Sequence, residues 1–344
     1  MFVLFTIFII FIFTTFYCDR SLNSFQVEPN VYVVGNGEDS LGSKIPCYWK
    51  NQDYFELPTG VNSISGEANS IYVNNNDIYI SGNIGSKPCY WKNGVLHFLT
   101  TNTPEIFGNT YSVYYANNEL YIAGENFNSP LLYSRPCYWR NNKYIELSLG
   151  DSTSAGAIAK SVFVADTNIF ITGEYKNSFN QIKPCFWKNG IFIKLDIFNG
   201  FVEGNTSSIF VTENTVYIIG ECKDSTNNIS YCFWKNGELN KLIFIIPSSI
   251  FIYKSDIYLA GTTTLNPHYW KNGNLIELPD NDSIAPWTTT SIFITSQGVY
   301  ISGDSFNGMY KWNPCYWKNG EINSLPILNK NVKFGKTESI FVTE

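Results

Sequence analysis

Short runs of alternating apolar and polar residues fill the chain from residue 31 onward, and they recur in groups of four. The fifth group is the clearest, with SIFVT (208–212), VYIIG (216–220), YCFWK (231–235) and ELNKL (238–242). Alternation with a period of two is typical of half-buried β-strands, and no stretch shows the spacing of an amphipathic helix. Asn236-Gly237 joins the third and fourth runs, and this dipeptide strongly favours a two-residue hairpin turn. Each group therefore predicts four antiparallel strands.

The third strand of every group carries a variant of the heptapeptide PCYWKNG, whose tryptophans recur 36 to 48 residues apart. Seven groups of four antiparallel strands at this spacing predict an all-β, seven-bladed β-propeller over residues 31–344. The first group lacks its opening strand, whereas SIFVTE (339–344) is an opening strand with nothing after it. We therefore expect strand 339–343 to pair with residues 31–35 and to close the ring, which removes exposed strand edges. The repeated tryptophans are Trp49, Trp91, Trp139, Trp187, Trp234, Trp270 and Trp317.

The repeat also resembles that of a known group of proteins. The motif Y-W-K-N-G, followed by a short strand that ends in Leu and then by S-I-x-V and D/N-x-Y-I-x-G, is similar to that of mostly bacterial secreted or surface repeat proteins. The likeness covers residues 31–344. It implies a β-propeller-like fold and a location outside the cell, and it implies no particular activity.

The first seventeen residues, MFVLFTIFIIFIFTTFY, contain no charge and no polar positions at helical spacing. The run is short for a membrane span and long for the apolar part of a signal peptide. We assign residues 1–18 to a signal peptide or, alternatively, to an N-terminal anchor, and residues 19–30 to a linker. Cys18 could carry a lipid, although the bulky Phe16 and Tyr17 do not fit the usual lipidation motif. All of these alternatives predict a secreted or cell-surface protein that contacts the membrane only through its N-terminal segment.

Composition narrows the choice of partners. Aromatic residues make up 17% of the chain and charged residues only 15%, which suits a β-rich protein. The net charge is −6, and the only arginines past residue 20 are Arg135 and Arg140. Because no basic run exists, we exclude a nucleic-acid partner.

Six cysteines occupy the Cys position of the repeated motif. Equivalent positions in adjacent blades should lie ~13–16 Å apart, beyond the ~7 Å Cα limit for a disulfide, so we interpret these cysteines as small buried residues. Cys222 stands outside the repeat, ten residues before Cys232, and a Cys222–Cys232 disulfide would join neighbouring strands of one blade. The repeat cysteines are Cys47, Cys89, Cys137, Cys185, Cys232 and Cys315.

A polar residue follows the last glycine of the second strand in six groups. These side chains could form a ring that holds a cation such as Ca²⁺, or they could simply end strands and cap turns. No calcium-loop motif supports the ion, so we predict no metal site and no cofactor. The residues are Asn36, Asn83, Glu125, Glu174, Glu221 and Asp304.

Two tryptophans fall outside the repeat, in connections that should lie on the propeller face with the long loops. Trp287 precedes the last blade, and Trp312 lies between its second and third strands, close to Phe306 and Tyr310. Because the sixth group is short, this aromatic set should border a notch, where it could stack on a sugar; the alternative is that the rings pack the loops.

These observations favour a secreted or surface-displayed binding scaffold that recognises a glycan or protein ligand. The alternative is a structural or adhesive envelope protein without a small-molecule site. A carbohydrate-active enzyme is less favoured, because His97 and His268 are the only histidines and no nucleophile elbow, zinc helix or phosphate loop is present. We therefore predict no enzymatic activity and no catalytic residues.

Overall fold

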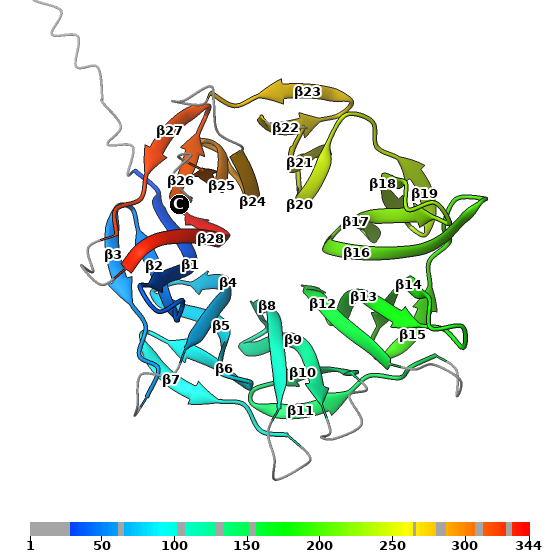
Figure 1. Cartoon of the computed structure of the whole chain (residues 1–344), viewed down its shortest axis with the longest axis horizontal. Helices are drawn as coiled ribbons and strands as arrows, with labels where there is room; N and C mark the ends of the chain where they lie inside the picture. Colours follow the sequence, from blue (N-terminus) through cyan, green and yellow to red (C-terminus); the bar gives the residue numbers. More distant parts are fainter. Residues whose placement is uncertain are drawn as a thin grey trace, which may run out of the picture.

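The computed structural model describes residues 28–60, 65–101, 107–127, 134–150, 156–263, 266–279, 287–306, 312–327 and 332–344. Within these ranges every regular element is a β-strand. The same residues include no helix with the length and apolarity needed to cross a bilayer. The strands form seven four-stranded antiparallel sheets arranged as blades around a central axis, which confirms the predicted propeller (Figure 1).

The first four blades run as follows. The first contains β28 (Val332–Thr343), β1 (Asn30–Asp39), β2 (Lys44–Lys50) and β3 (Asp53–Glu56). The second contains β4 (Gly66–Asn74), β5 (Asp77–Ile84), β6 (Lys87–Lys92) and β7 (Val95–Phe98). The third contains β8 (Gly108–Ala116), β9 (Glu119–Phe127), β10 (Ser134–Arg140) and β11 (Lys143–Glu146). The fourth contains β12 (Gly156–Ala165), β13 (Asn168–Lys176), β14 (Ile182–Lys188) and β15 (Ile191–Lys194).

The remaining three blades follow the same order from the axis outward. The fifth contains β16 (Phe201–Thr212), β17 (Thr215–Asp224), β18 (Ile229–Lys235) and β19 (Glu238–Lys241). The sixth contains β20 (Ile246–Tyr253), β21 (Asp256–Thr262), β22 (Pro267–Lys271) and β23 (Asn274–Glu277). The seventh contains β24 (Trp287–Thr295), β25 (Gly298–Phe306), β26 (Trp312–Lys318) and β27 (Glu321–Ser324).

The last strand closes the ring as expected. β28 pairs antiparallel with β1, with Val31 opposite Val342 and Val33 opposite Ile340, and it is the innermost strand of the first blade. Figure 1 shows this red strand beside the blue one at the inner edge of their sheet. The pairing covers the inner edge of β1, and β28 faces the channel as the innermost strands of the other blades do.

The asparagine of the repeated motif builds the turn between the third and fourth strands. Asn93 has a φ of 51°, in the left-handed region that asparagine tolerates better than most residues. Its side-chain oxygen accepts a hydrogen bond of 2.8 Å from the backbone N–H of Ile78, at the start of the second strand. The same bond forms in all seven blades, so this residue ties three strands together.

The tryptophan of the motif joins one blade to the next. The indole N–H of Trp91 donates a 2.8 Å hydrogen bond to the carbonyl oxygen of Pro58, just after the outermost strand of the preceding blade. Five other repeat tryptophans make the equivalent bond over 2.6–2.8 Å. The repeat cysteines are buried, as the sequence predicted, and all six are free thiols. Packing between blades therefore accounts for the Cys and Trp of the repeat.

Candidate functional site at the mouth of the central channel

The innermost strand of every blade contains at least one residue more than its partner strand, which makes a β-bulge, and β16 and β28 each have a second register shift. In β4 the register shifts between Ala68 and Ser70, so Asn69 has no partner on β5. A glycine opposite the bulge leaves room for it, since a Cβ on Gly82 would lie only 2.0 Å from the carbonyl oxygen of Glu67. The same shift occurs in all seven blades. The bulge residues are Asn69, Tyr111, Lys160, Ser207, Ser248, Thr290 and Glu338.

The bulge determines which side chains face the axis. Ala68 and Ile71 are three residues apart and would lie on opposite faces of a regular strand. The extra residue lets both be buried between blades, at 0% and 4% exposure. The bulge residue is consequently free to turn toward the axis, and five of the seven bulge residues line a common cavity.

This cavity lies at the end of the channel where the innermost strands begin, and its volume is about 730 Å³. Five consecutive blades, from the first to the fifth, build its wall. The lining is almost wholly polar. It consists of Glu338, Glu67, Asn69, Asn83, Asn109, Tyr111, Ile158, Lys160, Glu174, Asn205, Thr206 and Ser207.

Seven aromatic side chains form a closed ring around the axis, deeper in the channel. Adjacent ring centroids are 4.7–4.9 Å apart around the complete circle, and adjacent ring planes are inclined by 44–56°. In β4 the aromatic residue follows the bulge by three positions, so the ring lies roughly 10 Å below the bulge residues. Its members are Tyr72, Tyr114, Phe163, Phe210, Phe251, Phe293 and Phe341.

The angles between these rings fix their orientation. If seven equivalent ring planes all lie parallel to the channel axis, each plane is inclined to the next by one seventh of a turn, about 51°. The observed angles between adjacent rings lie on both sides of this value. Neighbours at such short spacing must overlap face to face, because rings side by side in one plane would clash. Seven centroids at this spacing lie roughly 5.5 Å from the axis, and the inward ring edges leave an opening of roughly 4 Å. The aromatic ring therefore constricts the channel below the cavity, whose lining it does not join, and we call it the aromatic floor.

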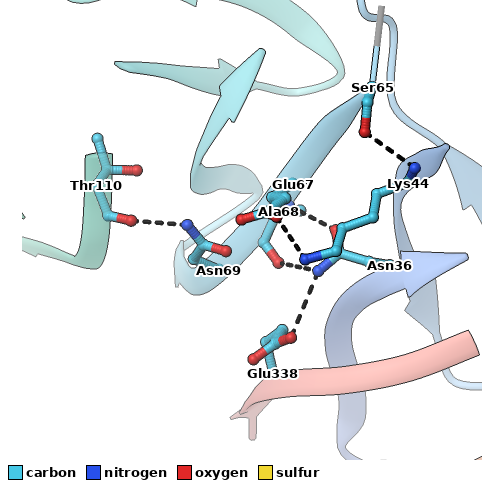
Figure 2. A network of polar contacts seen from close by, with 8 residues as sticks. All are labelled: Asn36, Lys44, Ser65, Glu67, Ala68, Asn69, Thr110 and Glu338. Carbon is cyan, nitrogen blue, oxygen red and sulfur yellow. Dashed lines mark hydrogen bonds and ion pairs between the residues drawn. The ribbon is translucent and has the colours of Figure 1, made fainter. Parts of the chain in front are cut away.

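Figure 2 shows how Asn36 connects two blades beneath the cavity wall. Its side-chain oxygen accepts a 2.7 Å hydrogen bond from the N–H of Ala68, and its amide nitrogen donates to the Ala68 carbonyl over 3.3 Å. The same nitrogen lies 3.5 Å from Oε1 of Glu338. Nearby, Lys44 Nζ pairs with Glu67 Oε1 at 2.5 Å. These contacts hold both carboxylates on the cavity wall.

Two other second-strand residues make the same bridge between blades. Asn83 accepts from the N–H of Thr110 over 3.0 Å, and Asp304 accepts from the N–H of Thr337 over 2.8 Å. Asp304 is only 2% exposed, and this burial raises the pKa of its carboxyl group to about 8. The Asn and Asp members of the predicted polar set therefore connect blades.

The glutamates of that set instead hold side chains that line the cavity. Glu125 accepts hydrogen bonds from the Tyr111 hydroxyl and, over 3.1 Å, from Asn109. Glu174 pairs with Lys160 at 2.5 Å. Glu221 accepts from Asn205 over 2.9 Å. In the described part of the chain no group of three or more His, Cys, Asp or Glu side chains is arranged to hold a metal ion.

The cavity has an excess of carboxylates. Among the described residues that line it, Lys160 stands against Glu67, Glu174 and Glu338. Lys160 pairs with Glu174 and the neighbouring Lys44 pairs with Glu67, so Glu338 is the carboxylate left over. Enclosure by the surrounding blades raises the pKa of Glu338; the nearby Lys44 ammonium opposes this shift and the Glu67 carboxylate adds to it. A neutral or positively charged ligand is therefore favoured over an anionic one.

The aromatic platform predicted beside the last blade is not assembled as expected. Trp287 begins the innermost strand β24, where it is only 4% exposed and packs on Trp317 with a centroid distance of 5.7 Å. Burial leaves no face of this ring for a ligand. Trp312 begins β26 and is partly exposed, with Lys336 Nζ 4.4 Å from its ring centroid. Tyr310 and the side chain of Phe306 lie outside the described residues, so their role stays a prediction.

The predicted Cys222–Cys232 pair does lie together. Both thiols are fully buried in the fifth blade, with the two Sγ atoms 3.6 Å apart, and both are free. The shared thiol contact, together with burial, raises the pKa of Cys232. The pair thus has the proximity that a disulfide needs without the bond itself.

A second cavity, of about 580 Å³, lies between the fourth and fifth blades at the opposite end of the channel. Phe163, Phe170 and Phe186 form its inner wall, and Lys188 and Glu213 lie at its polar rim. Phe163 belongs both to this lining and to the aromatic floor.

No family model and no curated protein sequence matches the chain. Solved structures match its fold. A puromycin-hydrolyzing peptidase of Mycobacterium tuberculosis is 8% identical, with a TM-score of 0.54 over 88% of this chain and 53% of that chain. The SapL1 lectin in complex with alpha methyl fucoside is 11% identical, with a TM-score of 0.44 over 75% and 96%. An ulvan lyase, a polysaccharide lyase, is 8% identical, with a TM-score of 0.48 over 74% and 81%. The likeness to the peptidase, at 8% identity, shows a shared fold alone.

The comparisons correct one expectation. The prediction of no enzymatic activity was wrong as an exclusion, because a puromycin-hydrolyzing peptidase shares this fold over 88% of the chain. A fold does not by itself determine function, so the absence of a contiguous catalytic motif does not exclude chemistry. The fold of the expected repeat family is present, while its bacterial origin receives no support from any sequence match.

Proposed function

We propose that the protein is a recognition scaffold that binds a neutral glycan at the mouth of its central channel. The observation that carries the proposal is the cavity of about 730 Å³, whose wall from five blades presents amide, hydroxyl and carboxylate side chains. Sugars present hydroxyl groups around their edge. Amide, hydroxyl and carboxylate groups bind these hydroxyls and fix the orientation of the ligand.

The polar groups of the wall are held in place before any ligand arrives. Asn69 donates a 2.7 Å hydrogen bond to the Thr110 carbonyl, which fixes its amide while leaving its side-chain oxygen to accept from a hydroxyl. Tyr111 and Asn109 are fixed by Glu125 in the same way. Such preorganisation lowers the entropic cost of binding.

The surplus of carboxylates supports a neutral ligand in particular. A uronate or sulfate group would face Glu338, whereas Glu67 is paired with Lys44 and Lys160 is paired with Glu174. Repulsion between like charges in a partly enclosed site disfavours such groups. The apolar residues 1–18 support the further proposal that binding takes place outside the cell or at its surface.

A glycan array probed with the full chain tests this function. We expect binding to a subset of neutral oligosaccharides, unchanged when calcium is removed, and binding at least about tenfold weaker to uronate-containing and sulfated glycans. Selective binding to the acidic glycans would overturn the charge argument. Binding to no glycan at all would overturn the proposal and would favour the structural or adhesive alternative.

A further inference from the structure

We propose that the channel site takes the end of a glycan chain and does not accept an internal segment. This inference rests on the proposed function and adds the part of the ligand that is recognised. It is carried by the closed aromatic ring, whose seven centroid distances are all 4.7–4.9 Å.

The floor prevents a polymer from passing through the channel. An opening of roughly 4 Å between aromatic edges is narrower than a pyranose ring with its hydroxyl groups. The rings have little freedom to move apart, because each contacts two neighbours and the residues beside them in sequence are core residues. In β4, Ile71 and Val73 on either side of Tyr72 are each 4% exposed.

The wall of the cavity prevents a glycan polymer from lying across the channel close to the aromatic floor. The lining side chains belong to five consecutive blades, from Glu338 in the first to Ser207 in the fifth. A segment that enters and leaves at the mouth would have to fold back on itself above the floor. A chain end needs only to point inward, toward the floor, with its hydroxyls against Asn69 and Tyr111.

The cavity volume fits the same conclusion. About 730 Å³ lies within the usual range of 300–1,000 Å³ for small-ligand sites and holds roughly two or three sugar units. The site therefore has room for a terminal stretch of a glycan, and the rest of the chain would extend into solvent.

A paired array tests this inference. Each neutral oligosaccharide is presented in two forms, one with its distal sugar free and one with that end extended by a bulky cap too large to enter the cavity, and both are probed with the full chain. We expect the extended forms to bind at least about tenfold more weakly, because the capped end can no longer enter the cavity. Equal binding of both forms would overturn end recognition while leaving the proposed function intact, whereas binding to neither form would overturn the proposed function itself.

A floor variant gives a second measurement. Phe251→Ala removes one of the seven rings, and Phe55→Ala removes a 40% exposed ring at the outer strand β3 as a matched control. We expect Phe251→Ala to narrow the difference between free and extended forms and Phe55→Ala to leave it unchanged. If a folded Phe251→Ala protein keeps the full preference for the free form, the aromatic floor has no role in end recognition. If that variant does not fold, the paired array with the unmodified protein decides whether the site takes a chain end.

Discussion

The aromatic ring of Phe341, on the last strand, lies with its centroid 4.7 Å from that of Tyr72, on the innermost strand of the second blade. On its other side Phe341 is 4.7 Å from Phe293 of the seventh blade. β28 therefore closes both the ring of blades and the aromatic floor. It also carries Glu338 to the cavity wall, so closure and the candidate site depend on one segment.

Removing that segment should destabilise the whole propeller. Deletion of residues 339–344 removes Phe341 and exposes the inner edge of β1, which is paired with β28 in the intact chain. We expect aggregation or rapid proteolysis of the truncated protein, because an open strand edge pairs with other chains. Size-exclusion chromatography and limited proteolysis provide the measurement, and deletion of Glu344 alone is the control. A truncated protein as stable and monomeric as the control would contradict closure.

The buried carboxyl of Asp304 should make stability fall as the pH rises. Its pKa is raised from 3.8 to about 8, so between these values the folded state holds a proton that the unfolded state has released. The stability it contributes is complete below pH 3.8 and is lost as the pH rises through about 8. Asn36 and Asn83 make the equivalent bridge with an amide. Asp304→Asn should therefore be more stable than the wild type at pH 8.5 by more than about 1 kcal/mol, with a smaller gain at pH 5.

Thermal unfolding at a series of pH values measures this difference. Asp224→Asn is the control, because Asp224 is exposed and serves a surface turn. If the melting temperatures of Asp304→Asn and the wild type change with pH in the same way, Asp304 does not titrate as described.

The two tryptophans outside the repeat should behave differently. Trp287→Ala removes a buried ring packed on Trp317 and should lower the free energy of unfolding by about 3–5 kcal/mol. Trp312→Ala removes a partly exposed ring and should cost about 1 kcal/mol or less. Chemical denaturation of both variants checks the ranking. If Trp287→Ala has normal stability but fails to bind glycan, the result would support the predicted role of Trp287 in a ligand platform.

Cys222 and Cys232 should form a disulfide when the protein meets an oxidant such as oxidised glutathione. Their sulfur atoms are 3.6 Å apart, and the bond would stabilise the fold by about 2–3 kcal/mol, given the short loop that it closes. Peptide mapping under non-reducing conditions identifies the bond, and Cys222→Ser is the control. Two free thiols after prolonged oxidation of the native protein would be inconsistent with this prediction.

The sequence predicts the blades well because their determinants are local. Asn93 and its equivalents mark each turn, and Trp91 and its equivalents mark each contact between blades. The bulge was missed because a period-two pattern gives no sign of an inserted residue, although the glycine at position 82 and its equivalents could have revealed it. The aromatic floor was missed for a different reason. The variable position of S-I-x-V is aromatic in every blade, yet only closure of the ring brings those seven residues together.

The prediction that Trp287 lies exposed in a loop was wrong, because no local pattern marks the start of its strand. Trp287 follows a variable connection and reads as part of a loop, yet it starts β24 and pairs with Ser305. Its burial depends on packing against Trp317, which no local pattern encodes.

The most direct test of the central claim compares two asparagines on one strand. Asn69 and Asn74 both belong to β4, but Asn69 lines the cavity above the aromatic floor and Asn74 ends the strand beyond Tyr72. Isothermal titration calorimetry with the strongest neutral glycan from the array should show binding to Asn69→Ala weakened by about tenfold or more, and Asn74→Ala binding like the wild type. Equal affinities for both folded variants would contradict recognition at the channel mouth.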